Sequence, residues 1–189
     1  MTAPLGGVVL AGGAGERLGQ PKATVDFHGE PLAARAVRLL RAAGCGPLVV
    51  SARAGRPLPS LDVPVVWDPP EADGVLEGLA TALASVEADD VLVVACDLPL
   101  AGPLLARLAA APPGEAVVAV DASGEMQPLC ARYPRRLALE AAAAALAADR
   151  RVQRWADTLS PTFVSATGNE LLNCNTPEDL ATALAAAEP

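Results

Sequence analysis

A glycine-rich segment near the start of the chain, residues 10–22, combines the residue types that bind phosphate. It reads Leu-Ala-Gly-Gly-Ala-Gly-Glu-Arg-Leu-Gly-Gln-Pro-Lys and follows the short apolar run of residues 6–10. Glycines let backbone N–H groups approach an anion, and Arg17 and Lys22 add positive charge. Lys22 is the only lysine of the chain, and a compact ammonium after a glycine loop indicates a phosphate site.

Two better-known phosphate loops do not match this segment. The P-loop requires Gly-x-x-x-x-Gly-Lys followed by Ser or Thr, whereas Lys22 lies between Pro21 and Ala23. The dinucleotide fingerprint Gly-x-Gly-x-x-Gly lacks its third glycine here, because Leu18 takes that place. Pro21 also interrupts any helix at this point. The segment therefore predicts a phosphate loop of another kind.

Asp97 is the second residue that points to chemistry, because it comes directly after Cys96 and the apolar run of residues 91–95. A carboxylate at the end of a buried strand is costly to desolvate without a partner. Mg²⁺ is such a partner, since it commonly joins one or two carboxylates to substrate phosphates. The alternative is that Asp97 only caps the helix that Pro103 begins or closes the Asp-x-Pro turn. A phosphate loop on the same edge of the sheet favours the metal.

The elements that must position these residues follow from the hydrophobic pattern, which alternates strand-like and helix-like segments. Strands are expected at residues 6–10, 23–27, 48–50, 63–67, 91–95, 117–120, 127–133 and 162–164. Helices are expected at residues 31–43, 74–86, 134–149 and 152–158, from Pro103, and from Thr176 with Pro177 and Asp179 as its capping residues. The 189 residues thus predict a single three-layer α/β/α domain with a mostly parallel, Rossmann-like sheet.

Two of these helices carry more detailed expectations. In the helix of residues 31–43, the arginines, Arg35 among them, are expected to point outward. In the alanine-rich helix of residues 134–149, Leu137 and Leu146 are expected to form the apolar stripe that packs on the sheet.

Four of the predicted strands end close to polar or glycine residues. Gly12, Ser51, Asp68 and Asp97 each follow or end such a strand. In parallel α/β sheets ligands bind outside the carboxyl ends of the strands. We therefore expect these residues to meet at one crevice.

Composition and charge exclude several classes of function. A net charge of −8 argues against a nucleic-acid or anionic membrane surface. No apolar run approaches the ~18 residues of a membrane span, and no secretion signal is recognisable, so a cytoplasmic protein is expected. The four cysteines are scattered without a Cys-x-x-Cys pair and are expected to be buried and free, and His28 is the only histidine. Zinc, a histidine metal cluster and a Ser-His-Asp triad are therefore disfavoured.

The segment from Leu10 to Lys22 resembles the L-A-G-G-x-x-x-R-[ML]-G-x-x-K opening of nucleotidyltransferases with a glycosyltransferase-A-like fold, and among them the molybdenum cofactor guanylyltransferases. Further segments resemble that family in the same order: Gly74 to Leu79 its G-P-L-x-G-[IL], Cys96 to Pro99 its C-D-x-P, Gln127 to Leu129 its Q-P-L, and Asn173 to Leu180 its N-x-N-T-P-E-D-L. The resemblance implies a sheet of the nucleotide-diphospho-sugar transferase type.

The resemblance also implies an activity. It is the Mg²⁺-dependent transfer of GMP from GTP to the terminal phosphate of molybdopterin or the molybdenum cofactor, which releases pyrophosphate. The nucleotide would bind in the half of about residues 1–100, and the acceptor in the half of about residues 101–189. Enzymes that make or accept the molybdenum cofactor are the candidate protein partners, while nucleic acid and membrane are not expected.

The same resemblance gives roles to individual residues. Arg17, Lys22 and Asp97 would be catalytic, with Asp97 as the Mg²⁺ ligand. The nucleotide would be bound by Leu10, Ala11, Gly12, Gly13, Lys22, Ser51, Asp68 and Asp97. The acceptor would be bound by Gln127, Asn173 and Asn175, with Asn175 as a further metal contact.

Three positions depart from the pattern of the guanylyltransferases. Pro21 stands where Asp is common, Ser51 where Asn is frequent, and Val75 where Pro is usual. The serine is shorter than asparagine, so the selectivity for the base is open. The related cytidylyltransferases usually read L-A-A-G, so Gly12 and Gly13 favour guanine.

Other functions remain as alternatives. The first is a cytidylyltransferase of the molybdenum cofactor or another sugar-type nucleotidyltransferase. The second is a catalytically silent nucleotide-binding subunit that regulates other enzymes, although the presence of both Lys22 and Asp97 favours an enzyme. The third is a structural α/β domain, which leaves the glycine loop unexplained.

Overall fold

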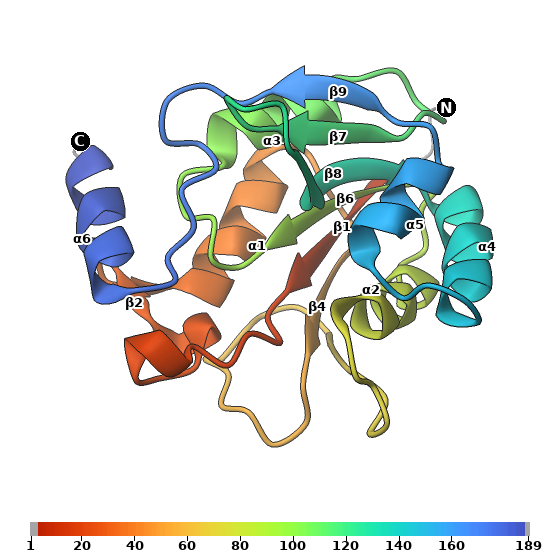
Figure 1. Ribbon diagram of the computed structural model, residues 1–189. Coiled ribbons are helices and arrows are strands. Elements are labelled where there is room, and N and C mark those ends of the chain that lie inside the picture. Colours follow the sequence, from red (N-terminus) through yellow and green to blue (C-terminus); the bar gives the residue numbers. More distant parts are fainter. Residues whose placement is uncertain (1–3, 188–189) are drawn as a thin grey trace.

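The computed structural model describes residues 4–187 and shows a central sheet with helices on both faces (Figure 1). The sheet has seven strands in the order β5-β4-β1-β6-β8-β7-β9. They are β1 (Leu5–Leu10), β4 (Leu48–Ala52), β5 (Val65–Trp67), β6 (Asp90–Ala95), β7 (Val117–Val120), β8 (Met126–Pro134) and β9 (Thr162–Ser165). Only β8 runs antiparallel to its neighbours. The mostly parallel sheet of a single α/β domain is therefore confirmed.

The helices form two layers around this sheet. Helices α1 (Leu32–Ala42) and α3 (Gly102–Ala109) cover one face. The other face is covered by α2 (Val75–Ser85), α4 (Arg135–Leu146) and α5 (Val152–Thr158). Helix α6 (Pro177–Ala186) packs outside these layers, against a small hairpin of β2 (Asp26–Phe27) and β3 (Glu30–Pro31). Figure 1 shows α6 at one side of the molecule and α4 at the other.

Strand β6 shows how the sheet separates two hydrophobic layers. Leu92 and Val94 pack into the layer of α1 and α3, whereas Val91 and Val93 pack into the layer of α2, α4 and α5. All four side chains are buried. Burial on both faces is typical of parallel α/β sheets and explains the continuous apolar run in this part of the sequence.

The strand register brings the functional segments to one edge of the sheet. Leu10 lies opposite Ser51 on β4 and Ala95 on β6. Backbone hydrogen bonds extend this pairing past the strand ends, since the N–H of Cys96 donates to the carbonyl of Leu10 at 3.0 Å and that of Asp68 to Ala52 at 2.8 Å. The expected crevice at the carboxyl ends therefore has a rigid floor.

The strand expected at residues 23–27 is mostly wrong. Only Asp26–Phe27 is a strand, and Lys22–Thr24 forms a 3₁₀ turn, η2. Local bonds close this turn, because the Thr24 hydroxyl donates to the Pro21 carbonyl at 2.9 Å and the Val25 N–H to the Lys22 carbonyl at 3.2 Å. The turn leads into the hairpin of β2 and β3.

The apolar stripe expected on the alanine-rich helix is also partly wrong. Leu137 is 42% exposed, and the fully buried residues of α4 are Ala138 and Ala142. Small side chains let α4 approach α2 and α5 closely, and the Trp155 indole N–H donates to the Ala138 carbonyl at 3.2 Å. Leu146 packs against this layer as expected and is the last residue of the helix.

Arg35 does not point outward as expected. Its Nε donates to the Pro99 carbonyl at 2.6 Å, and its guanidinium lies 4.5 Å from the centre of the Phe27 ring. The arginine therefore joins α1 to the loop after β6, which carries Asp97.

Two other expectations are confirmed, the capping box and the free cysteines. Thr176 and Asp179 form a reciprocal capping box at the start of α6. The four cysteines are buried and free. Within residues 4–187, the helices are all too short or too polar to cross a bilayer.

Candidate active site

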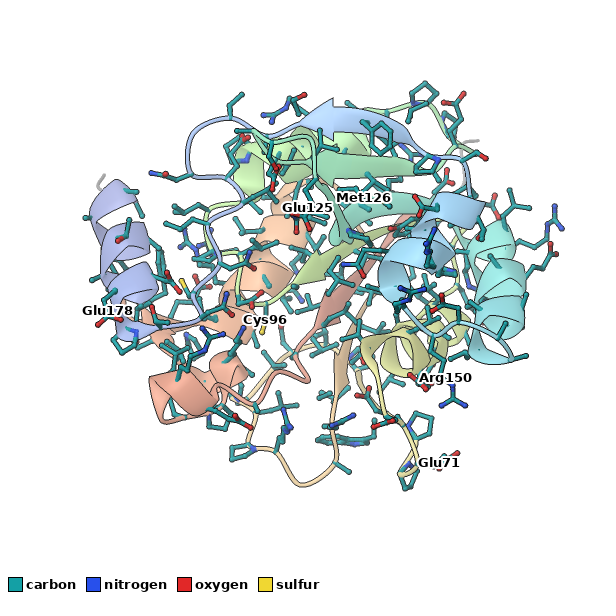
Figure 2. The ribbon with its side chains drawn as sticks, in the orientation of Figure 1. Glu71, Cys96, Glu125, Met126, Arg150 and Glu178 are labelled. Carbon is teal, nitrogen blue, oxygen red and sulfur yellow. The ribbon has the colours of Figure 1, made fainter. Side chains whose placement is uncertain are left out.

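A cavity of about 410 Å³ opens at the carboxyl edge of the sheet. Cys96, which is labelled in Figure 2, comes directly after β6 and lines this cavity. The wall residues of the cavity come from the ends of β1 and β6, from the segments after β1, β4, β5 and β6, and from β8: Leu10, Gly12, Gly13, Ala14, Lys22, Arg53, Arg56, Asp68, Asp73, Gly74, Val75, Ala95, Cys96, Asp97 and Leu129. The glycine loop, Asp68 and Asp97 therefore share one cavity, as their positions in the sequence predicted.

One end of this cavity is built around Lys22. Its Nζ donates to Asp97 Oδ2 at 2.5 Å and to Asn175 Oδ1. The side chains of Lys22 and Asp97 are only 17% and 13% exposed. The Cys174 N–H donates to the Asp97 carbonyl at 2.9 Å, which fixes the loop of Asn175 next to β6. Three distant segments thus converge on one ammonium group.

Asp97 Oδ1 is buried and has no hydrogen-bond partner among the described residues. Such an atom is rare in folded proteins, because desolvation without a partner costs free energy. In the described part of the chain, His, Cys, Asp and Glu form no group of three or more that could hold a metal alone. The two oxygen atoms available as metal ligands are Asp97 Oδ1 and the amide oxygen of Asn175. They fit a hard cation that takes its remaining ligands from phosphate and water.

The glycines of the loop have a steric function. Gly15 has φ of +66°, and a Cβ there would lie 1.9 Å from the Gln20 carbonyl oxygen. A Cβ on Gly13 would lie 3.0 Å from Lys22 Cδ. Glycine is therefore required at position 15 for the loop to fold back, whereas at position 13 it leaves room for the Lys22 side chain, which a Cβ would push aside.

Two arginines at the cavity escaped the sequence analysis. Arg53 donates to the Ala72 carbonyl at 2.8 Å, and Arg56 donates to the Gly12 carbonyl. Both line the cavity and tie its walls together. In the sequence, the one indication was that both arginines come soon after the predicted strand end at Ser51. Their connection to the glycine loop is visible only in the tertiary structure.

Ser51 and Arg17 lie outside the cavity wall. Ser51 is 2% exposed and donates to Asp68 Oδ1 at 2.7 Å, so the structure places it behind Asp68. Arg17 is exposed on the 3₁₀ turn η1 (Glu16–Leu18), which has no buried residue. The expectation that Ser51 lines the crevice is therefore wrong, whereas the roles of Arg17 and Ser51 in nucleotide binding and catalysis stay predictions.

The acceptor candidates lie on the other side of Asp97. A smaller cavity of about 160 Å³ is lined by Gln127, Asn173 and Gln153, and it shares Asp97 and Leu129 with the first. Asn175 lines neither of these two cavities, because its amide oxygen is held by Lys22. Two adjoining cavities with a carboxylate between them suit two substrates that must react with each other.

The charges around the larger cavity nearly cancel. Lys22, Arg53 and Arg56 oppose Asp68, Asp73 and Asp97. Lys22 is already paired with Asp97. In a protein of net charge −8, a polyphosphate bound here gains little from the long-range field, so its charge must be met by local donors and a cation.

The fold and the site together define a nucleotidyltransferase. A mostly parallel α/β sheet carries a glycine loop after β1 and, after β6, a carboxylate that lies between two cavities and is paired with a lysine. The chain belongs to the family of the MobA-like NTP transferase domain, whose model matches residues 7–162.

Curated relatives are similar over nearly the whole chain. A molybdenum cofactor guanylyltransferase of Xanthomonas euvesicatoria is 36% identical over an alignment of 181 residues, which covers 93% of this chain and 92% of the relative. A probable molybdenum cofactor guanylyltransferase of a Nostoc species is 37% identical over an alignment of 186 residues, which covers 92% of this chain and 87% of the relative.

Solved structures share the fold at lower identity. Molybdopterin-guanine dinucleotide biosynthesis protein A of Archaeoglobus fulgidus gives a TM-score of 0.74 at 22% identity, covering 96% of this chain and 98% of the other. The 2-C-methyl-D-erythritol 4-phosphate cytidylyltransferase of Thermus thermophilus gives a TM-score of 0.74 at 19% identity, with 99% of each chain covered. The fold is thus shared by enzymes named for different nucleotides, so it does not choose the base.

Proposed function

We propose that this chain transfers GMP from GTP to the terminal phosphate of molybdopterin or of the molybdenum cofactor. The observation that carries the proposal is its likeness, along more than nine-tenths of its length, to relatives named molybdenum cofactor guanylyltransferase. An oxygen of the acceptor phosphate attacks the α-phosphorus of GTP. The bond to the β-phosphate oxygen breaks, and pyrophosphate leaves with the bonding electron pair.

The protein's part in this reaction is to position the substrates and to stabilise charge. The acceptor phosphate needs no side-chain base, since the second pKa of a phosphate monoester is about 6 and it is largely ionised near pH 7. The glycine loop offers backbone N–H groups to the triphosphate, and Lys22 lies beside it as a cation. Such preorganised donors stabilise the negative charge that develops on the leaving pyrophosphate.

We also propose Mg²⁺ as the cofactor. Asp97 Oδ1 and Asn175 Oδ1 would hold it, and the buried, unpartnered Asp97 Oδ1 is the observation that supports this assignment. When bound, the ion supplies positive charge to the phosphates and the leaving group. Lys22 donates to the same Asn175 Oδ1 and is paired with the same carboxylate, so the ammonium and the ion compete for this amide oxygen and for the charge of Asp97.

The two cavities suggest where each substrate lies. We assign GTP to the larger cavity in the half of about residues 1–100, and the acceptor to the smaller one, which Gln127 and Asn173 line. Most of the residues of the smaller cavity come from the half of about residues 101–189. Enzymes that supply or receive the cofactor are the partners we propose, and a cytoplasmic location stays a prediction.

The test is an assay of pyrophosphate release by the purified protein with molybdopterin and each of GTP, CTP, ATP and UTP, in Mg²⁺ or in EDTA. We expect release with GTP that depends on both the acceptor and Mg²⁺. Release with CTP alone would instead make the protein a cytidylyltransferase. Nucleotide binding without release under any condition would indicate a silent regulatory subunit.

A further inference from the structure

The end of the larger cavity near Asp68 contains a hydrogen bond that the proposed reaction does not use. The Ser51 hydroxyl lies beneath Asp68 and donates to Asp68 Oδ1 at 2.7 Å, while the Gly78 carbonyl oxygen is 3.4 Å from the same Oγ. A hydroxyl has one proton to donate, so the shorter contact identifies its partner. Ser51 is 2% exposed, and it therefore contacts ligand only through Asp68.

The Asp68 carboxylate lies in a slot between two glycines. A Cβ on Gly78 would lie 2.6 Å from Asp68 Oδ1, and a Cβ on Gly12 would lie 3.5 Å from Oδ2. The backbone of Asp68 is fixed as well, because its N–H donates to the Ala52 carbonyl at 2.8 Å. Three contacts thus fix the direction of this carboxylate: the Ser51 hydroxyl beneath it, Gly78 on one side, and the backbone hydrogen bond from Asp68 to the end of β4.

Only one oxygen of this carboxylate is engaged. Oδ1 accepts from Ser51, whereas Oδ2 accepts no hydrogen bond from the residues that the structure describes. Asp68 lines the cavity and Ser51 does not. The arrangement therefore presents a fixed, free acceptor to whatever occupies this end of the cavity.

The position of Asp68 in the sheet indicates which part of a nucleotide it meets. Asp68 follows β5 and Asp97 follows β6, and the strand order β5-β4-β1-β6 separates them by three strand spacings. At about 4.8 Å per spacing this is roughly 14 Å, less the lean of the carboxylate toward Gly12. A nucleotide with its phosphates at Asp97 and Lys22 reaches that far with its base, beyond its ribose.

We propose that Ser51 is a positioning residue which, through Asp68, aims a carboxylate oxygen at the edge of guanine that carries N1–H and the 2-amino group. The inference rests on the proposed function, since it takes GTP as the nucleotide. A carboxylate only accepts hydrogen bonds. Guanine offers it two adjacent donors, whereas cytosine and adenine place an acceptor nitrogen beside a single amino group, and that nitrogen repels the carboxylate.

The proposal accounts for serine at a position where the family frequently has asparagine. The short hydroxyl side chain stays below the cavity and reaches only Asp68. In this protein the Asp68 carboxylate, rather than the side chain of residue 51, would then select the base.

The test compares Ser51→Ala with the wild-type protein by calorimetric titration with GTP, ITP and 2′-deoxy-GTP in Mg²⁺. ITP lacks the 2-amino group, so its affinity reports on that donor, and 2′-deoxy-GTP reports on the ribose. We expect the wild type to prefer GTP over ITP about 10-fold, the size of one hydrogen bond to a charged acceptor. In Ser51→Ala the preference should fall to about 2-fold or less, with weaker binding of GTP.

Three further variants separate a positioning role from a structural one. Ser85→Ala is the matched control, because that hydroxyl donates to the Thr81 carbonyl at 2.8 Å on the exposed side of α2, and it should keep the wild-type preference. Ser51→Thr retains the hydroxyl and should also keep it. In an Asp68→Asn background, Ser51→Ala should change the preference no further, because residues that act in series are not additive.

The outcomes distinguish this inference from the function on which it rests. Equal weakening of GTP and ITP in Ser51→Ala would overturn the positioning role while leaving GTP as the substrate. Loss of the preference for GTP over 2′-deoxy-GTP instead would place the carboxylate on the ribose and also overturn it. A wild-type protein that prefers CTP would overturn the proposed function as well. If Ser51→Ala does not fold, Gly78→Ala displaces the same carboxylate, and an unchanged GTP preference in that variant would overturn the proposal.

Discussion

The two ends of the larger cavity hold an aspartate in different ways. Asp97 is paired with a charged donor, Lys22, and its second oxygen is buried without a partner. Asp68 is held by a neutral hydroxyl between two glycines, and no protein group of the described chain donates to its second oxygen. Asp97 can exchange Lys22 for another cation, whereas the slot holds the Asp68 carboxylate in one orientation. The difference separates an end suited to chemistry from an end suited to recognition.

Replacement of the carboxylate at the first end should give the largest effect. In Asp97→Asn the shape is kept, but the charge that would hold a cation is lost. We expect turnover to fall by about 10³-fold, at the upper end of the loss of one preorganised catalytic group. Pyrophosphate release measures the loss, and circular dichroism should show an unchanged fold.

Asp62→Asn is the matched control for this change, since Asp62 forms only an exposed ion pair with Arg41. It should keep wild-type turnover. An Asp97→Asn enzyme within a few-fold of the wild type would remove Asp97 from the chemistry.

Removal of the Lys22 ammonium should lower turnover less than Asp97→Asn does, and it should strengthen metal binding rather than weaken it. In Lys22→Met we expect turnover to fall by about 10²-fold, because one cation near the phosphates is lost. The affinity for Mn²⁺ without nucleotide should rise about 10-fold, since Asn175 Oδ1 is freed and the negative charge of Asp97 is no longer neutralised, and electron paramagnetic resonance of the ion can measure it. Weaker metal binding in this variant would contradict the competition between Lys22 and the metal.

The slot at the second end can be closed by one methyl group. Alanine is usually better than glycine inside a helix by about 1 kcal/mol, but a Cβ at position 78 would lie 2.6 Å from Asp68 Oδ1. We therefore expect Gly78→Ala to bind GTP about 10-fold more weakly, because the displaced Asp68 carboxylate loses about one hydrogen bond to the nucleotide. Calorimetric titration measures the affinity.

Gly102→Ala is the control for this glycine, because the added Cβ would meet only the Leu39 side chain at 3.2 Å, away from the cavity. It should leave GTP binding unchanged. Tighter binding of GTP by Gly78→Ala would show that Asp68 is not held by the slot.

The smallest effect is expected when the metal is removed. Chelation with EDTA should weaken the binding of GTP and ITP by the same factor, so their ratio should stay within about 2-fold of its value in Mg²⁺. The reason is that Asp68 and the proposed ion site lie at opposite ends of the cavity. A ratio that collapses in EDTA would mean that the two ends act as one unit.

Both ends were predicted from the sequence only in part. The glycine loop, Asp97 and Asp68 were predicted to share one crevice, because strand ends in a parallel sheet meet at one edge, and the structure places them together. Ser51 was predicted to face the nucleoside and instead lies behind Asp68. The difference arises from the alternation of side chains along β4 and from the contact with α2, which a single sequence does not reveal.

Helix packing shows a similar limit. The pattern of residues 134–149 predicted a helix, but the leucine expected in its stripe, Leu137, is exposed, and alanines face the sheet. Hydrophobicity alone favours the leucine as the buried residue. The close approach of α2 and α5 decides for the smaller side chains, because volume as well as polarity governs what fits between packed helices.

The sequence by itself determined the alternation of strands and helices, the phosphate loop, the carboxylate after β6 and the capping box of α6. These features depend on near neighbours in the chain, whose periodicity and turn chemistry act locally. The tertiary structure decided that Lys22 meets Asn175, which is 153 residues away, that Arg56 holds Gly12 and that Ser51 orients Asp68. Such contacts depend on strand order and on the packing of distant segments, which no local pattern encodes.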